Sequence, residues 1–418
     1  MSERVPIAIV GCGGMGRRHL TGIAALYRTD FRNVDLVAVC DLNLQNAEDL
    51  ADEAGQQLGA RPRVFGGISD MVAAMPQIRG VDIVTDAASH HRLAVAAFEA
   101  GLNVLCEKPL ALTIRGCNAI IAAAASAGRV LSVAENYRRD PMNRLIRALI
   151  DDGAIGTPRL ALDLNVGGGD RMIITPWRHR KLSGTIVLDA GVHNADILQY
   201  YLGGVESVYG EGRLFERYRR KGAAGGPGGF YAKWFDQVPD RFEADGDDAI
   251  FGYLRFASGA IGQWTYNRAG FGQPFSTLQV FGSKGSITSQ GHRNGKTPRL
   301  FVSEGQEVTS EGILEYAPSY RLAPVAAALF GGERPHTYSF PFAETDAKIL
   351  ALEYHEFAEC VRAGTAPEVD GAVARHAVAI VNGLLESGVA GRALTLSEVE
   401  AGGVDSYQRE IDQHYGLA

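Results

Sequence analysis

The fold of this chain is decided near its amino terminus, by the stretch Val5-Pro6-Ile7-Ala8-Ile9-Val10-Gly11-Cys12-Gly13-Gly14-Met15-Gly16. The apolar run from Pro6 to Val10 is typical of a buried parallel strand, and glycines with the spacing G-x-G-x-x-G follow it directly, before a helical pattern from Arg17. In such a loop the first glycine permits a tight turn, the second lets a pyrophosphate approach the backbone, and the third lets helix and strand pack closely. The sequence therefore predicts a dinucleotide-binding loop formed by Gly11, Gly13, Gly14, Met15 and Gly16.

Short apolar runs alternate with longer amphipathic ones as far as Val133, as a parallel sheet covered by helices requires. One expected helix, Leu93 to Ala100, ends at Gly101 as a C-terminal glycine cap would. We expect a Rossmann domain over residues 1–137, with strands at Pro6 to Val10, Val34 to Cys40, Arg63 to Phe65, Ile83 to Asp86, Asn103 to Cys106 and Val130 to Val133.

The rhythm changes after Tyr137, where a helix near Met142 to Asp151 precedes strand-like stretches separated by turn signals. The expected strands are Arg159 to Asn165, Val205 to Leu214, Ala249 to Phe256, Ala260 to Tyr266, Thr277 to Phe281 and Arg299 to Val302. We therefore predict an α/β fold class, with a second α+β domain over residues 138–418 that holds a large, mostly antiparallel open sheet. Two helical patterns, Thr345 to Ala363 and Gly371 to Ser387, either cover this sheet or return to the first domain.

A Gly-rich, irregular stretch from Arg217 to Asp247 interrupts the second domain and contains Phe230, Tyr231, Trp234 and Phe235. Long loops in compact domains serve as lids or binding loops, or are disordered connectors. A lid or subunit contact and a passive insertion both remain open, and the aromatic side chains suit stacking on a sugar ring.

The composition excludes several classes of protein. The chain has 418 residues, 46% of them hydrophobic, and a formal net charge of -7 without a clustered basic stretch, so nucleic acid is not an expected partner. The longest apolar stretch, Ala119 to Ala127, is too short to span a membrane, and the amino terminus lacks the features of a signal peptide, which predicts a cytoplasmic protein. Five cysteines without metal-ligand spacing are expected to be reduced core residues, and no metal site is predicted.

Asp41 ends the second expected strand, 25 residues beyond Gly16, where an acidic residue accepts hydrogen bonds from the adenosine ribose. A carboxylate there repels a 2′-phosphate, and no arginine follows it, since the next residues are Leu42 and Asn43. NAD is therefore favoured over NADP. The alternative is an aspartate that only caps a helix or a turn.

Two further segments follow strands at the edge where open parallel sheets place their ligands. The first is Thr85-Asp86-Ala87-Ala88-Ser89-His90, and the second is Glu107-Lys108-Pro109. The proline fixes the chain direction directly after the lysine, so Lys108 can be held beside a nicotinamide, although a surface turn lysine has the same local pattern.

Together with the glycine loop, several motifs in order resemble the Gfo/Idh/MocA family of oxidoreductases, which includes inositol dehydrogenases and glucose-fructose oxidoreductase: His90, Glu107-Lys108-Pro109, Asn136-Tyr137-Arg138, Trp177-Arg178 and the run Asp189 to Asp196. The resemblance extends from Val5 to about Thr395. It implies that Lys108, Asp189 and His193 are catalytic, and that these three and Asp196 contact the substrate. It further implies that the cofactor is bound by Ala87, His90, Glu107, Lys108, Asn136, Trp177 and Arg178, besides the glycine loop and Asp41.

The steps of four and then three residues from Asp189 to His193 to Asp196 put all three side chains on one helical face. The mechanism that follows has His193 as the base for a substrate hydroxyl, alone or with Lys108, while hydride passes to the nicotinamide. Lys108 would stabilise the developing alkoxide, and Asp189 would orient or balance the pair.

The resemblance suggests a sugar, an inositol or a glycoside as substrate. An exposed face of the second-domain sheet is commonly buried by self-association, so we expect a homo-oligomer, either a dimer or a tetramer. The chain departs from many family members at Thr85-Asp86, where Thr-Pro is common, in the 217–247 stretch and in the tail after Leu396. These departures leave a dihydrodiol or another cyclic alcohol open as substrate. A glycosidase that oxidises its substrate transiently and a non-catalytic NAD-binding sensor are the other readings, and the three catalytic side chains together argue against the sensor.

Overall fold

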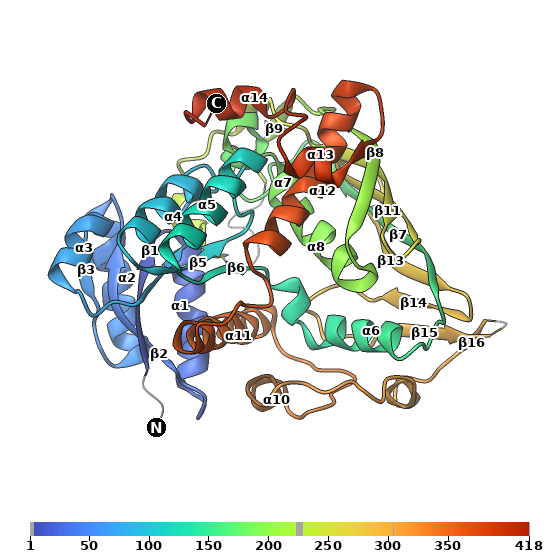
Figure 1. Cartoon of the computed structure of the whole chain (residues 1–418), viewed down its shortest axis with the longest axis horizontal. Coiled ribbons are helices and arrows are strands. Elements are labelled where there is room, and N and C mark those ends of the chain that lie inside the picture. The colour runs from blue at the N-terminus through green and yellow to red at the C-terminus, as the bar shows by residue number, and fades with distance from the viewer. Residues whose placement is uncertain (1–3, 223–228, 304, 418) are drawn as a thin grey trace.

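The computed structural model describes residues 4–222, 229–303 and 305–417 (Figure 1). Its amino-terminal part is a six-stranded parallel sheet with the strand order β3-β2-β1-β4-β5-β6. The order reverses between β1 and β4, and ligands of open α/β sheets bind outside the carboxyl ends of the strands at such a point. The strands are β1 Val5–Val10, β2 Val34–Cys40, β3 Arg63–Phe65, β4 Gly80–Ile83, β5 Asn103–Glu107 and β6 Leu131–Ala134.

The predicted Rossmann fold is confirmed, with one strand displaced along the sequence. Strand β4 ends at Ile83, whereas the apolar pattern predicted a strand from Ile83 to Asp86. The buried Asp82 interrupts that pattern, because its carboxylate pairs inside the protein with His19 and Tyr354 instead of facing water. Thr85 and Asp86 consequently lie in the loop after the strand.

Helices cover both faces of the first sheet, and one of them comes from the far end of the chain (Figure 1). The local helices are α1 Gly14–Tyr27, α2 Leu44–Leu58, α3 Ile68–Ala74, α4 His90–Glu99 and α5 Ile114–Ala127. Helix α11 (Phe342–Ala363) packs along α1, and a β-carbon at Gly22 would lie 2.5 Å from Cβ of Leu350, so the two helices approach closely. Of the two alternatives for this helical pattern, the structure selects the return to the first domain.

The second sheet has nine strands in the order β16-β15-β14-β13-β7-β12-β11-β8-β17. Among the described pairs only β7 and β12 run parallel, so the predicted mostly antiparallel sheet is confirmed. Helix α12 (Gly371–Ala390) covers β8 and also contacts α5 and α8. The strands are β7 Pro158–Gly168, β8 Val205–Arg213, β11 Ala249–Phe256, β12 Ile261–Gly270, β13 Phe275–Gly282, β14 Gly285–Ser289, β15 Arg299–Val302, β16 Gln306–Glu307 and β17 Leu394–Thr395.

The remaining helices connect the two sheets or lie around the second one. They are α6 Pro141–Asp151, α7 Ile186–Asp189, α8 Gly191–Leu202, α9 Ala232–Phe235, α10 Pro324–Phe330, α13 Leu396–Glu400 and α14 Arg409–His414. None of the helices in the described ranges is both long and apolar enough to cross a bilayer. All five cysteines are buried and unpaired, as predicted.

The predicted loop 217–247 contains secondary structure. Strands β9 (Tyr218–Arg220) and β10 (Arg241–Glu243) pair in an antiparallel ribbon, which is anchored by a 2.7 Å ion pair between the buried Arg219 and Asp248. Residues 223–228 of this stretch lie outside the described residues. Beyond them, residues 229–238, here called the strap, reach the first domain, where Nζ of Lys233 lies 2.6 Å from the Asp49 carboxylate on α2.

The carboxyl-terminal tail joins the two parts of the molecule (Figure 1). The side-chain oxygen of Gln408 accepts a 2.8 Å hydrogen bond from the backbone N–H of Ile114, at the start of α5. The Tyr415 hydroxyl donates at 2.7 Å to the carbonyl oxygen of Leu182, which precedes α7. The tail therefore contacts both sides of the cleft between the sheets.

Candidate active site

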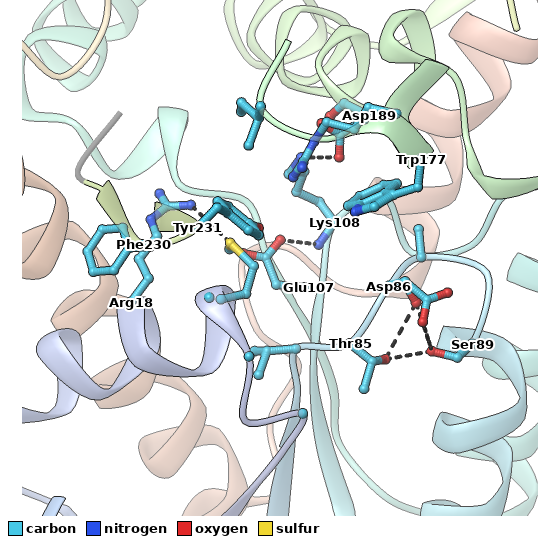
Figure 2. A pocket seen from close by; sticks show the side chains of 18 of the residues that line it. Arg18, Thr85, Asp86, Ser89, Glu107, Lys108, Trp177, Asp189, Phe230 and Tyr231 are labelled. Atoms are coloured by element: carbon cyan, nitrogen blue, oxygen red, sulfur yellow. Dashed lines mark hydrogen bonds and ion pairs between the residues drawn. The ribbon is translucent and has the colours of Figure 1, made fainter. Parts of the chain in front are cut away.

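A cavity of about 780 Å³ lies between the carboxyl edge of the first sheet and the second domain (Figure 2). It extends from the glycine loop to the junction of α7 and α8. Both parts of the chain supply its lining, and the polar and aromatic members include Arg18, Asp41, Thr85, Asp86, Glu107, Lys108, Tyr137, Trp177, Arg178, Asp189, His193, Tyr231, Tyr266, Arg293 and Phe342.

The glycine loop at one end of the cavity has the shape that a pyrophosphate needs. Gly11 has a φ of 104°, which side-chain-bearing residues rarely adopt, and a β-carbon at Gly16 would lie 2.3 Å from the carbonyl oxygen of Gly11. A β-carbon at Gly13 would meet no atom within 4 Å, because Gly13 faces the cavity. Gly14 and Met15 also line it, so this open space at the start of α1 fits a dinucleotide phosphate.

Asp41 lies at the same end and is fixed by backbone hydrogen bonds. One carboxylate oxygen accepts from the N–H of Cys12 at 2.7 Å, and the other accepts from the N–H of Asn43 at 2.8 Å. The cap of α2 is Asn43, so helix capping does not account for Asp41. Each carboxylate oxygen has more than one acceptor position, and Asp41 and the 91%-exposed Leu42 line the cavity together.

Lys108 and Asp189 meet at the opposite end, where β5 faces α7. Nζ of Lys108 lies 2.7 Å from the carbonyl oxygen of Asp189 and 3.1 Å from its carboxylate, which also accepts a 2.8 Å hydrogen bond from Nε of Arg178 (Figure 2). Burial favours a raised pKa for Asp189, but the charges of Arg178 and Lys108 hold that pKa well below its ordinary value. Asp189 is therefore an ionised carboxylate between two cations.

His193 lines the cavity beside this group and presents a neutral ring. Burial, together with the charges of Lys108 and Arg293, holds the pKa of His193 well below its ordinary value. The imidazole stacks on Tyr137 with 4.3 Å between ring centroids and 4° between planes. Its Nδ1 lies 2.7 and 2.9 Å from the two carboxylate oxygens of Glu135, so Nε2 is the nitrogen left for a ligand.

The other predicted contacts on the cavity come from three segments. Ala87 lines it from the loop after β4, and Trp177 and Arg178 line it from a short 3₁₀ turn, Pro176–His179. Glu107 lines it as well, and one of its oxygens accepts from the backbone N–H of Lys108 at 2.8 Å while the other lies 3.1 Å from Nε2 of His19. Burial alone would raise the pKa of Glu107, but His19 and Lys108 lower that pKa to about 2.

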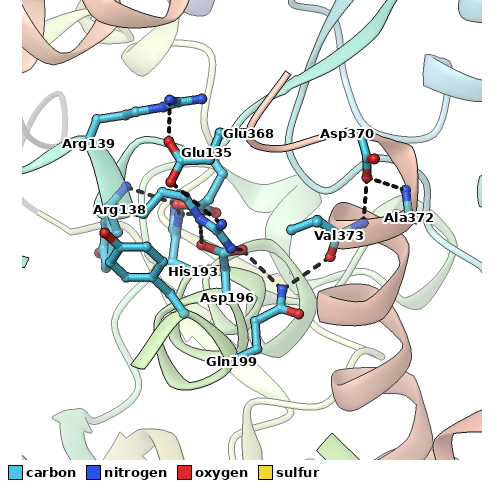
Figure 3. A network of polar contacts seen from close by, with 12 residues as sticks. Glu135, Arg138, Arg139, His193, Asp196, Gln199, Glu368, Asp370, Ala372 and Val373 are labelled. Carbon is cyan, nitrogen blue, oxygen red and sulfur yellow. Dashed lines mark hydrogen bonds and ion pairs between the residues drawn. The ribbon is translucent and has the colours of Figure 1, made fainter. Parts of the chain in front are cut away.

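Four predicted site residues lie behind the cavity lining: Gly16, His90, Asn136 and Asp196. The His90 ring lies between the two loops that carry the site, with Nδ1 2.9 Å from the carbonyl oxygen of Pro109 and Nε2 3.3 Å from that of Thr85. The carboxylate of Asp196 is held by Arg138, with Nε at 2.8 Å, and by Gln199 (Figure 3).

The prediction that Asp189, His193 and Asp196 lie on one helical face is wrong. Helix α7 ends at Asp189 and α8 begins at Gly191, so the segment is broken at Ala190. Asp189 and His193 still reach the cavity, whereas Asp196 turns toward Arg138 inside the protein. The break arises where Lys108 takes the carbonyl oxygen of Asp189 as an acceptor.

Arg18, Arg293 and Glu135 are among the site residues that were not predicted from the sequence. Arg18 and Arg293 line the cavity and share the carboxylate of Asp346 on α11, at 2.5 to 2.9 Å. Arg293 comes from the loop after β14 and belongs to no motif. Glu135 directly precedes the motif Asn136-Tyr137-Arg138, but a glutamate at this place in the sequence looks like an ordinary surface residue. Within the described residues, His, Cys, Asp and Glu side chains form no group that could hold a metal ion.

The strap covers part of the dinucleotide end of the cavity (Figure 2). Phe230 and Tyr231 line the cavity, and a β-carbon at Gly14 would lie 3.0 Å from the carbonyl oxygen of Phe230 and from the ring of Tyr231. The guanidinium of Arg178 lies 5.4 Å from the Tyr231 ring centroid. The strap therefore connects the glycine loop with the opposite wall.

Comparisons with known proteins agree with this geometry. The model of an oxidoreductase family with an NAD-binding Rossmann fold matches residues 5–135, and the model of the GFO/IDH/MocA C-terminal domain matches residues 143–288. A D-apiose dehydrogenase of Paraburkholderia graminis is 34% identical over 49% of this chain, and the match spans about half (51%) of that enzyme's length. A levoglucosan dehydrogenase of Pseudarthrobacter phenanthrenivorans is 29% identical over 72% of this chain and 77% of its own. An NAD binding oxidoreductase from Klebsiella pneumoniae has the same fold, with a TM-score of 0.73 at 23% identity over 94% of this chain and 99% of that chain.

Proposed function

The chain belongs to the Gfo/Idh/MocA family of oxidoreductases, and on that premise we propose that it is an NAD-dependent dehydrogenase. Its reaction moves a hydride between the nicotinamide and a secondary alcohol or ketone of a sugar, an inositol or a glycoside. The observation that carries this proposal is the meeting of Lys108, Asp189 and His193 on the same cavity as the glycine loop.

Residues at both ends of the cavity suit the cofactor. Gly11, Gly13, Gly14 and Met15 would hold the pyrophosphate, and Asp41 would accept hydrogen bonds from the adenosine ribose. A 2′-phosphate would lie against the Asp41 carboxylate, so we propose NAD in preference to NADP. When bound, the nicotinamide supplies the hydride acceptor for alcohol oxidation.

The side chains at the nicotinamide end have separate parts in the chemistry. Nε2 of His193 accepts the substrate's hydroxyl proton, since its ring is neutral and its other nitrogen is occupied by Glu135. The ammonium group of Lys108 stabilises the negative charge that develops on the substrate oxygen. Asp189 holds that ammonium group in place with two acceptors, its backbone carbonyl oxygen and its ionised carboxylate.

The wall around these groups supports a polyhydroxylated substrate. Trp177, Tyr137, Tyr266 and Phe342 offer ring faces, and Arg293 offers guanidinium donors beside them. The matched relatives are named D-apiose dehydrogenase and levoglucosan dehydrogenase, and these names support the same class. Because Asp196 is paired with Arg138 behind the lining, we propose no substrate contact for it.

Three further properties complete the proposal. We propose a homo-oligomer, because the outer face of the large sheet exposes Tyr209 and Tyr253 side by side on paired strands, with Phe275 and Phe281 farther along the sheet. Five unpaired cysteines support a reducing, cytoplasmic location. We place the division between the two domains near residue 137, after the last strand of the first sheet.

The test follows reduced-nicotinamide absorbance while the protein and NAD or NADP meet a panel of sugars, inositols, glycosides and cyclic diols. We expect NADH to form with one polyol class, and His193→Ala to lower turnover by roughly 10²- to 10⁴-fold, the usual worth of a general base. Full activity in that variant would refute the role of His193. Tight NAD binding with no NADH formed on any compound would favour the NAD-recycling glycosidase or the sensor.

A further inference from the structure

Glu135 contacts the ring of His193, as Figure 3 shows. It directly follows β6, it is only 3% exposed, and it does not line the cavity. Its two carboxylate oxygens lie 2.7 and 2.9 Å from Nδ1 of His193, so Nδ1 faces the carboxylate nearly symmetrically. Substrate bound in the cavity would meet His193 and not Glu135.

We propose that Glu135 is a positioning residue of the dehydrogenase: it sets the tautomer of His193, so that the Nε2 lone pair faces the substrate, and it stabilises the imidazolium that forms during alcohol oxidation. This inference rests on the function proposed above. It adds a fourth side chain to the set Lys108, Asp189 and His193.

The tautomer follows from what each group can donate. An ionised carboxylate has no proton, so the hydrogen bond requires the proton on Nδ1, and a neutral imidazole then carries none on Nε2. Two contacts keep this arrangement in place. The backbone N–H of Tyr137 donates to Glu135 at 3.0 Å, and the Tyr137 ring stacks between the rings of His193 (4.3 Å) and His292 (4.4 Å).

The proposed step conserves protons and electrons. The substrate O–H bond breaks, and its proton goes to Nε2 of His193. The C–H bond on the same carbon breaks, and its hydride passes to the oxidised nicotinamide. A C=O double bond remains in the substrate. His193 then carries two protons and a positive charge. The carboxylate of Glu135 lies against that charge, in the way that an aspartate or glutamate supports the histidine of a hydrolase triad.

The surroundings of Glu135 make its charge sensitive to pH. The cations near Glu135 are Lys108 and Arg138. The carboxyl groups that interact with it electrostatically are those of Glu107, Glu353 and Asp196. Burial outweighs the lowering effects of the Tyr137 N–H and the two cations, and raises the pKa of Glu135 to about 7. Below that pH the carboxylic acid donates to Nδ1, the remaining imidazole proton moves to Nε2, and His193 cannot act as a base.

The experiment compares wild type with Glu135→Gln and Glu135→Asp. We expect kcat for alcohol oxidation to fall by about 10- to 100-fold in the glutamine variant, the range found when a metal-bound histidine loses the partner that orients it. KM should change by less than about threefold, because Glu135 does not meet the substrate. The wild-type rise of kcat near pH 7 should disappear in Glu135→Gln and return in Glu135→Asp.

Glu368→Gln is the matched control, because the partly buried Glu368 lies in the adjoining group of ion pairs (Figure 3) but contacts Arg138, Arg139 and Arg144 instead of His193. It should alter stability and leave the pH profile of kcat as in wild type. A glutamine variant of Glu135 with wild-type kcat and pH profile would overturn the proposal, as would the same profile change in Glu368→Gln.

A second measurement separates this inference from the proposed function. Imidazole ¹⁵N spectra of the protein at pH 8 report the tautomer of His193 without any substrate. We expect the proton on Nδ1 in wild type and a mixture or the Nε2 form in Glu135→Gln. Failure of the whole polyol panel with this tautomer present would refute the dehydrogenase alone, whereas an Nε2-protonated wild-type ring at pH 8 would refute the role of Glu135.

Discussion

Nζ of Lys108 is bonded to both the carbonyl oxygen and the carboxylate of Asp189, at 2.7 and 3.1 Å. The two residues come from different domains, so this double contact fixes the ammonium group across the cleft. Lys108 directly follows β5, and Asp189 is the last residue of α7. The helix is interrupted at the next residue, Ala190. The position of the Lys108 ammonium group therefore depends on how the two domains meet.

Asp189→Asn should lower kcat strongly without abolishing cofactor binding. The amide keeps the size of the side chain but leaves Lys108 and Arg178 adjacent without the anion between them. We expect a loss on the order of 10²- to 10³-fold, comparable to removing a preorganised electrostatic group. Stopped-flow hydride transfer measures the loss and NADH fluorescence titration serves as the control; an unchanged transfer rate would contradict the assignment.

Gly13→Ala and Gly16→Ala should fail in different ways. A methyl group at Gly13 enters the open space where the pyrophosphate would lie, so Tm should stay near wild type while the Kd for NAD rises. An overpacking cost of about 1–3 kcal/mol corresponds to roughly 5- to 150-fold in Kd. A methyl group at Gly16 collides with the Gly11 carbonyl and should lower Tm itself. Calorimetry of both variants checks this, and an unchanged Kd in Gly13→Ala would place the cofactor elsewhere.

Asp41→Ala should relax the preference for NAD. Removal of the carboxylate takes away the negative charge that a 2′-phosphate would meet, and it also removes two hydrogen bonds that order the backbone at Cys12 and Asn43. We expect the ratio of kcat/KM for NAD over that for NADP to fall by at least about tenfold, which corresponds to 1.4 kcal/mol. Asp52 is an exposed acid on α2, the helix that follows Asp41, and Asp52→Ala should leave the ratio unchanged.

Asp196→Ala should act on stability and not on substrate affinity. The change leaves Arg138, which is 6% exposed, without its bidentate partner, and the loss of one member of a buried ion pair costs about 3–5 kcal/mol. Denaturant unfolding should show this loss, while KM at a temperature where the variant is folded should stay close to wild type. A large rise in KM with normal stability would restore the substrate contact implied by the family resemblance.

Glu353→Gln should stabilise the protein more at high pH than at low pH. Neither carboxylate oxygen of Glu353 has a hydrogen-bond partner among the described residues, and burial raises the pKa of Glu353 from 4.5 to about 8. Between these two values the folded protein holds a proton that the unfolded chain has released, so wild-type stability falls as pH rises. The glutamine variant lacks this term, and its advantage in unfolding free energy should grow from pH 5 to pH 8. Glu344→Gln, exposed on the same helix, should show no such trend.

Local sequence patterns predicted the parts of the fold that are locally determined. The glycine loop, β2 and β3 follow from apolar runs and turn residues, which act over a few residues. Strand β4 was misplaced because Asp82 is a buried polar residue whose partners, His19 and Tyr354, lie far away in the sequence. Strands β14, β16 and β17 were missed because they are short or lack clear apolar alternation, and pairing with neighbouring strands determines them.

The site divides in the same way. Lys108, Asp189 and His193 belong to ordered motifs, and the structure brings them to one cavity. Arg293 and Glu135 escaped prediction because their importance comes from what the fold places next to them, and nothing in their own segments signals it. Asp196 shows the converse, since the chain turns its carboxylate to Arg138 after the break at Ala190.

The strap and the tail together bear on how long a cofactor stays. The tail bonds both walls of the cleft through Gln408 and Tyr415, which opposes a wide hinge opening. A dinucleotide on the glycine loop would then leave past Phe230 and Tyr231, with the Lys233–Asp49 contact broken on the way. In many enzymes product release of this kind, and not the chemical step, limits kcat. Rapid mixing should therefore show a burst of NADH followed by a slower steady state, with the oxidised sugar departing before its coenzyme.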